Sequence, residues 1–123
     1  LLAGIGAYFV LALFNADHDR NLDETVALAR KAYANRPSIH AADALAWALY
    51  KTGKAEQAQK YSAEALKLGT KDSLKLFHAG MIALDLGEME PAREYIEEAL
   101  AINPHFSILY SDEARMILKT LQS

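Results

Sequence analysis

The chain has 123 residues, of which 52% are hydrophobic and 24% are charged, and its formal net charge is −3. A chain of this length can bury a core, and its small numbers of glycine (6) and proline (3) favour helices over long irregular loops. The mildly acidic balance excludes the basic stripe typical of nucleic-acid-binding surfaces, and the absence of cysteine excludes a disulfide framework. The composition therefore predicts an all-α protein without a nucleic-acid partner.

The first expected helix runs from about Leu2 to Ala16 and is apolar around almost its whole circumference, which is typical of a helix with neighbours on several sides. The uncharged run ends at Asp17, short of the about 20 apolar residues that a membrane span needs. We expect a packed helix, and the end of a membrane segment stays open as an alternative. Because the chain starts with Leu1, we expect a fragment of a longer protein. Its localisation is unknown; the cytoplasm is favoured, and a missing upstream signal would make it periplasmic or extracellular.

Further helical segments follow, separated by short turns. We expect them at about Asp23–Arg36, Ile39–Lys51, Ala55–Leu68, Ser73–Leu86, a sixth segment with Pro91 in its first turn and Asn103 at its end, and Ser107–Leu121. Gly53 and Gly87 supply turns because glycine reaches positive φ at no steric cost. Helices joined by turns this short pack antiparallel, so the pattern predicts helix pairs.

The sequence repeats with a period of 34 residues. When Gly53 is aligned with Gly87, the same residue types recur at four further pairs: Ala58 and Ala92, Tyr61 and Tyr95, Ala65 and Ala99, Leu66 and Leu100. A small residue recurs at one place in every first helix: Ala12, Ala46, Gly80 and Ala114. A small side chain there lets the two helices of a pair approach closely. A fixed period of this length is typical of a repeat array.

These residues resemble the tetratricopeptide repeat family. The third unit matches its pattern at Gly80, Ala92, Tyr95, Ala99 and Pro104, and the second unit matches nearly as well at Ala46, Gly53, Ala58 and Ala65. The resemblance implies an all-α, right-handed superhelical solenoid of antiparallel helix pairs, with about seven helices in one domain over residues 1–123. Its parts are repeat one (5–37), repeat two (39–72), repeat three (73–106) and a capping helix (107–121).

In this family the first helices of the pairs line a concave groove, and partners usually bind there. The resemblance places these residues in the groove: Phe9, Leu13, His40, Asp43, Trp47, Tyr50, Lys51, Phe77, His78, Met81, Leu84, Ser111, Asp112, Arg115 and Lys119. Its middle would be aromatic and apolar, which favours a protein or peptide partner with apolar anchors. The alternative is that the large apolar residues form the core between helices.

Some family members grip a C-terminal carboxylate with Lys, Asn and Arg in the groove. The corresponding places in this chain are not basic, since they hold Asp43, Trp47, His78, Ile108 and Asp112. We therefore expect no binding of acidic tails in that manner.

His40, Asp43 and His78 are a candidate for a metal site, but three residues without a matched fourth ligand favour ordinary polar groove residues instead, and Asp17-His18-Asp19 is likewise more simply a solvated turn. The sequence contains no cysteine nucleophile, no glycine-rich phosphate loop and no serine-centred motif. We expect neither catalysis nor a cofactor.

The leading hypothesis is a non-catalytic protein-interaction scaffold. The alternative is a self-associating structural segment of a longer array, with the apolar residues Leu1–Phe14 as the contact surface, because a terminal repeat needs a polar outer face. A small-ligand binder that uses the Trp47–Tyr50 region is a third hypothesis, and no polar constellation supports it.

Overall fold

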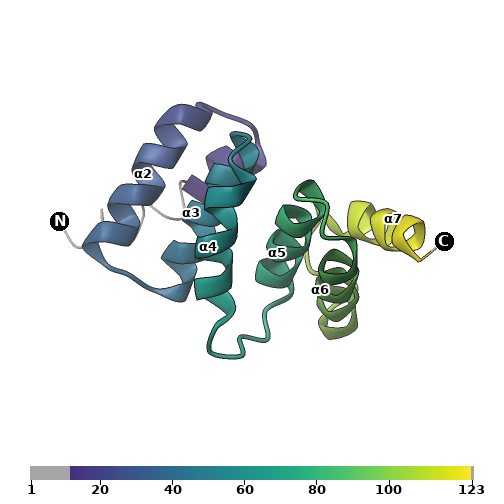
Figure 1. Cartoon of the computed structure of the whole chain (residues 1–123). Helices are drawn as coiled ribbons and strands as arrows, with labels where there is room; N and C mark the ends of the chain where they lie inside the picture. The colour runs from purple at the N-terminus through teal and green to yellow at the C-terminus, as the bar shows by residue number, and fades with distance from the viewer. Residues whose placement is uncertain (1–11, 123) are drawn as a thin grey trace. The chain divides into compact units, whose positions relative to one another are not determined.

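The computed structural model describes residues 12–122, and these are helical without a strand (Figure 1). Residues 12–17 form a helical segment. The helices that follow are α2 (Leu22–Asn35), α3 (Ile39–Lys51), α4 (Ala55–Leu66), α5 (Ser73–Asp85), α6 (Met89–Ile102) and α7 (Ser111–Leu121). The all-α fold class is confirmed, whereas most of the predicted first helix lies outside the described residues.

The last helix begins at Ser111, four residues later than the expected start at Ser107. Its delay has a local cause, because serine hydroxyls offer the backbone an alternative to helical hydrogen bonds. Ser107 Oγ accepts the backbone N–H groups of Leu109 and Tyr110 at 3.2 and 3.1 Å. Ser111 Oγ in turn accepts the N–H of Ser107 at 2.8 Å. These bonds hold residues 107–110 in a turn that precedes the helix.

The chain divides into two compact units between Lys67 and Leu68. In the first unit α3 packs against both α2 and α4. Every residue of α3 from Ala41 to Leu49 is buried, and five of these nine are alanines. Alanine lets helix axes approach closely but buries little apolar area, so Leu45, Trp47 and Leu49 provide most of the buried volume.

In the second unit α5 packs against α6, and α7 packs against α6 (Figure 1). Gly80 permits the close approach of α5 and α6, because a Cβ there would lie 2.7 Å from Cγ1 of Ile96. Phe77, Ile82 and Ile96 are among the largest fully buried side chains of the chain. The small residue that the repeat predicts in each first helix therefore has the predicted role in this pair.

The turns between paired helices use glycine in the left-handed region. Gly53 has φ 82° and Gly87 has φ 77°, and a Cβ at either would meet nothing within 4 Å. Replacing Gly87 by alanine is therefore expected to cost about 1–2 kcal/mol through backbone conformation alone. Urea unfolding would measure the loss, and Gly87→Asn should lose less because asparagine tolerates this region. Equal losses in the two variants would contradict this account.

Asp72 caps the N-terminus of α5. Its side chain accepts the backbone N–H of Lys75 at 3.1 Å and pairs with Lys75 Nζ at 3.2 Å. Burial alone raises the pKa of the Asp72 carboxyl, but the backbone hydrogen bond and the charge of Lys75 outweigh it, so the pKa is lowered. The ionised carboxylate therefore stabilises the folded state.

Removal of this cap is expected to destabilise the second unit. Asp72→Ala should cost about 1 kcal/mol, the usual value for a helix N-cap. The pKa of Asp72 is lower in the folded state than in the unfolded state. The electrostatic part of the stability that Asp72 contributes is therefore present above the unfolded pKa of about 3.9, and it is lost as the pH falls through the folded pKa. Urea unfolding at neutral and acid pH would test this. Asp72→Asn, which keeps a capping oxygen, should lose mainly the pH-dependent part.

Candidate functional site

Trp47 lies in the interior of the first unit and links α3 to the C-terminal end of the helical segment 12–17. The indole is 1% exposed, and its Nε1 donates to Oδ1 of Asp17 at 2.8 Å. Its ring stacks on Tyr50 at a centroid distance of 4.8 Å, and Lys51 Nζ lies 5.8 Å from the indole centroid. Lys51 also pairs with Asp19 at 3.0 Å. This network gives Trp47 a structural role and leaves its ring little surface for a partner.

The other predicted groove residues of the first unit are exposed to different degrees. His40 is exposed, and Leu13, Tyr50 and Lys51 are partly exposed. Asp43 is buried. Phe9 lies outside the described residues. Of the predicted groove residues on α3, His40 is thus accessible near the N-terminal end of the helix, and Tyr50 and Lys51 are partly accessible at its C-terminal end.

The predicted groove residues of the second unit fall into two groups. Phe77, His78, Met81 and Ser111 are buried, whereas four residues are partly or fully exposed: Leu84, Asp112, Arg115 and Lys119. Phe77 is 0% exposed, and its ring lies 5.3 Å from that of Phe106 and 5.1 Å from that of Tyr110. It therefore fixes the segment between α6 and α7 to α5.

A hollow of about 430 Å³ opens beside α7 in the second unit. Its lining is mostly apolar and consists of Leu84 from α5 with Glu113, Met116, Ile117, Thr120 and Leu121 from α7. Of these only Leu84 is among the residues that the family resemblance selects. The 34-residue register places Met116 at the same position as Ile82, and this signal could have identified Met116 as a second lining residue.

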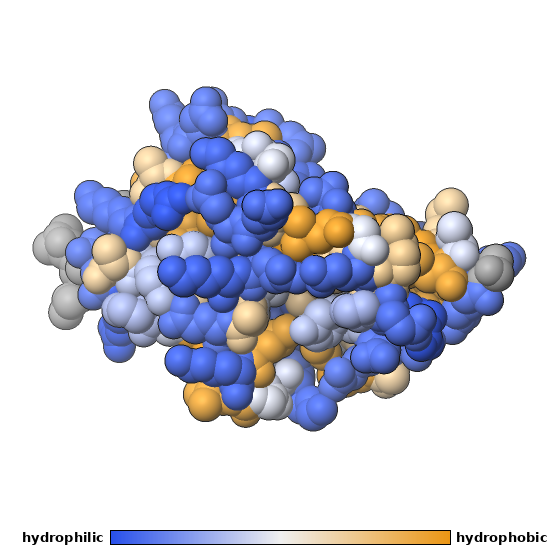
Figure 2. All heavy atoms as spheres, in the orientation of Figure 1, coloured by the Kyte–Doolittle hydropathy of each residue, from blue (hydrophilic) through white to orange (hydrophobic). Residues whose placement is uncertain are grey.

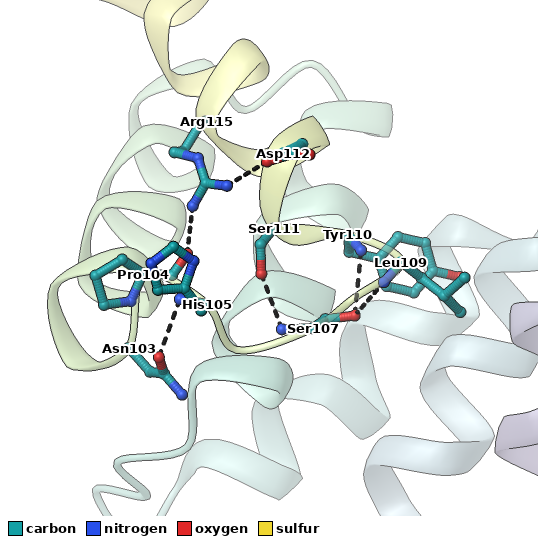
Figure 3. A network of polar contacts seen from close by, with 9 residues as sticks. All are labelled: Asn103, Pro104, His105, Ser107, Leu109, Tyr110, Ser111, Asp112 and Arg115. Carbon is teal, nitrogen blue, oxygen red and sulfur yellow. Dashed lines mark hydrogen bonds and ion pairs between the residues drawn. The ribbon is translucent and has the colours of Figure 1, made fainter.

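A smaller and more polar hollow of about 220 Å³ lies at the N-terminus of α7. Its rim includes Arg115, which donates to the carbonyl of Pro104 and pairs with Asp112 (Figure 3). Nearby, Asn103 Oδ1 accepts the N–H of His105 at 3.0 Å. These bonds organise the connection between α6 and α7. An anionic ligand would need the guanidinium of Arg115, but the carboxylate of Asp112 already lies next to it.

The outer face of α6 is held by ion pairs. Arg93 pairs with both Glu90 and Glu97, and these partners raise the pKa of the guanidinium. The pKa of Glu97 is lowered, first by a hydrogen bond from Gln122 Nε2 at 3.1 Å and then by Arg93. Gln122 directly follows α7, so this bond links the end of α7 to α6.

A tyrosine pair joins α2 to α4. The hydroxyl of Tyr33 donates to Glu64 at 2.7 Å, and this hydrogen bond to a carboxylate is the main cause of the raised pKa of Tyr33. Its ring meets that of Tyr61 edge-on at 5.3 Å. These contacts contribute to the packing of α2 against α4 in the first unit.

Across residues 12–122 no three His, Asp or Glu side chains gather closely enough to hold a metal ion. Over the same residues no helix combines the length and the apolar character that crossing a bilayer requires. On the face shown in Figure 2, polar side chains cover most of the surface, and apolar side chains form separate patches between them.

The fold is shared with a solved structure of 16% sequence identity. The crystal structure of PcrH from Pseudomonas aeruginosa superposes with a TM-score of 0.78 and covers 98% of this chain and 93% of its own. At this identity the likeness shows the fold, which confirms the predicted solenoid of antiparallel helix pairs. No curated protein matches the chain.

The family assignment comes from the sequence. Residues 18–99 match the family described as "Anaphase-promoting complex, cyclosome, subunit 3". They include all of α2 to α5 and most of α6. This is a family of tetratricopeptide-type repeats, so the predicted resemblance is confirmed, and its fold is that of a protein-interaction scaffold. The chain therefore belongs to the anaphase-promoting complex, cyclosome, subunit 3 family of helical repeats.

Proposed function

We propose that this chain is a non-catalytic scaffold that binds a peptide or a helix of another protein through the first helices of its repeats. The observation that carries the proposal is the set of helix pairs in a 34-residue register, together with the family match. Stacked helix pairs of this kind offer extended surfaces for protein partners.

The exposed residues of the first helices combine apolar side chains with charged ones, and this combination supports a partner that carries apolar anchors. In the first unit Tyr50 lies next to Lys51, and both are partly exposed. In the second unit Leu84 is partly exposed and lines the larger hollow, while Arg115 is exposed on α7. Trp47 and Phe77 serve binding indirectly in this proposal, because they hold the helices that carry these residues.

A capture experiment with the whole chain tests the proposal. Tyr50→Ala and Leu84→Ala should each weaken binding of a captured protein about tenfold, which corresponds to a moderate interface hot spot. Leu68→Ala is a matched control, because Leu68 is 78% exposed and lies outside the first helices. Circular dichroism would verify that the variants are folded. If all three variants bind like the wild type, the first helices are not the binding surface.

Self-association is the competing proposal, with Leu1–Phe14 as its contact surface. Sedimentation equilibrium over a wide concentration range separates the two. If the chain is a monomer at every concentration, self-association is rejected. If the chain forms a dimer that still binds the captured protein, both proposals hold.

A further inference from the structure

The turn that follows the helical segment 12–17 differs from the two equivalent turns of the chain. Asp19 lies 34 residues before Gly53 and 68 residues before Gly87. All three residues have a left-handed backbone, with φ 53°, 82° and 77° respectively. Glycine adopts this conformation at no steric cost, whereas the Cβ of an aspartate disfavours it. An aspartate therefore stands at a place where the backbone favours glycine.

The same turn contains a second left-handed residue, Asn21, with φ 44°. Asn21 directly precedes α2, and its side chain makes no capping hydrogen bond. The hydroxyl of Thr25 donates to the carbonyls of Arg20 and Asn21, at 3.1 and 2.9 Å. Unfavourable backbone conformations persist where surrounding contacts fix them, and they cluster at functional sites. Side-chain contacts from α2 thus help to hold this turn in place.

The carboxylates of Asp17 and Asp19 both contact α3. Oδ1 of Asp17 accepts the indole N–H of Trp47 at 2.8 Å, and Asp19 pairs with Lys51 Nζ at 3.0 Å. A glycine at position 19 would ease the backbone but would lose the ion pair with Lys51. The side chain of Asp19 is therefore the reason to have an aspartate at this place.

These two contacts act on the predicted groove residues that remain partly exposed at the end of α3. Trp47 is buried, and its ring stacks on that of Tyr50 at 4.8 Å with an interplanar angle of 17°. Lys51 Nζ lies 5.8 Å from the indole centroid, and its side chain is 20% exposed. Side chains that are held in one orientation before binding lose less conformational entropy when a partner binds. The two carboxylates thus preorganise Tyr50 and Lys51.

We propose that Asp17 and Asp19 are positioning residues of the binding surface on α3. Asp17 fixes the indole on which Tyr50 stacks, and Asp19 fixes the ammonium group of Lys51. The proposal rests on the proposed scaffold function and adds the residues that preorganise its site in the first unit. The opposing account is a plain turn, in which Asp19 only serves as a residue type that tolerates a left-handed backbone.

Asp19→Gly separates the two accounts, because glycine suits the backbone and removes only the side chain. Acetylation of the whole chain with acetic anhydride, followed by mass spectrometry, would measure the reactivity of Lys51. It should rise about two- to fivefold, the range expected for loss of a partly exposed ion pair. Lys54, which is exposed in the same unit, is the internal reference and should react as in the wild type. The midpoint of urea unfolding should not fall.

Two variants of Asp17 test the contact with the indole. Asp17→Ala removes the acceptor of the indole N–H, whereas Asp17→Asn keeps an oxygen acceptor. Trp47 is the sole tryptophan, so its fluorescence reports this contact directly. Acrylamide should quench the fluorescence of Asp17→Ala more strongly than that of the wild type, and Asp17→Asn should resemble the wild type.

Binding of the protein captured by the whole chain tests the role of these contacts in recognition. Asp19→Gly and Asp17→Ala should each weaken its binding about two- to fivefold, which corresponds to the loss of preorganisation by one weak contact. Asp17→Asn should bind like the wild type.

Three outcomes would overturn the proposal in favour of a plain turn. They are unchanged acetylation of Lys51 in Asp19→Gly, unchanged binding in both Asp19→Gly and Asp17→Ala, and a urea midpoint that falls in parallel with binding. Failure of the proposed function would look different. In that case Tyr50→Ala would bind like the wild type while Asp19→Gly still accelerates the acetylation of Lys51, and the positioning contacts would stand.

Discussion

Replacing Trp47 by alanine is expected to destabilise the first unit by about 3–5 kcal/mol, the usual cost of truncating a fully buried large aromatic residue. The indole is 1% exposed, and its Nε1–H donates to Asp17, the last residue of the helical segment 12–17. The variant loses apolar burial, leaves a cavity in the interior and removes the link between α3 and the helical segment 12–17. Urea unfolding followed by circular dichroism would measure the change.

Trp47→Phe separates packing from hydrogen bonding. It retains a buried ring but lacks the donor to Asp17, so it should lose about 0.5–1.5 kcal/mol for the hydrogen bond plus a small packing term. A loss below about 1 kcal/mol in Trp47→Ala would contradict a buried structural role. It would restore Trp47 as a surface residue available to a partner.

Replacing Phe77 by alanine is expected to destabilise the second unit by a similar amount, about 3–5 kcal/mol. Phe77 is 0% exposed and contacts the rings of Phe106 and Tyr110, which belong to the connection between α6 and α7. The loss should therefore extend to α7. Hydrogen exchange at the amides of Tyr110 and Ala114 should accelerate more than exchange in α3, which lies in the other unit.

The position of Trp47 provides the control for this experiment. It is the sole tryptophan and lies in the first unit, so its fluorescence reports the unfolding of that unit. In Phe77→Ala the unfolding transition seen by circular dichroism should broaden or shift, with a smaller shift in the fluorescence transition. Phe77→Leu, which retains most of the buried volume, should lose less stability. Unaltered exchange at Ala114 would show that α7 does not depend on Phe77.

The helices were predictable where local signals coincide. The bounds of α3 are those predicted, Ile39–Lys51, because Ser38 Oγ caps it by accepting the N–H of Ala41 and Gly53 ends its turn. The start of α7 was not predictable from apolar spacing. It depends on hydroxyl hydrogen bonds of Ser107 and Ser111, which compete with the helix.

The binding surface was harder to predict than the fold. In a repeat protein, aromatic residues at helical spacing on a first helix can either pack in the core or line the groove. Their spacing alone cannot distinguish these two positions. Trp47 and Phe77 are buried, whereas the selection of Leu84 and Arg115 as binding residues stays a prediction. The concave positions that the resemblance supplies do not include Met116, which shares the register of the buried Ile82.

The alanine-rich interior of α3 has a consequence for the variation that this chain tolerates. Ala42, Ala44, Ala46 and Ala48 are each 0% exposed, and a close-packed protein interior leaves little room for additional side-chain atoms. Truncation removes little at these positions, whereas one added branched side chain forces helices apart at a cost of about 1–3 kcal/mol. Amino-acid substitutions along α3 should therefore be limited by the side-chain volume that they add rather than by the hydrophobicity that they remove. Related chains should preserve small residues there even where their surfaces have diverged completely.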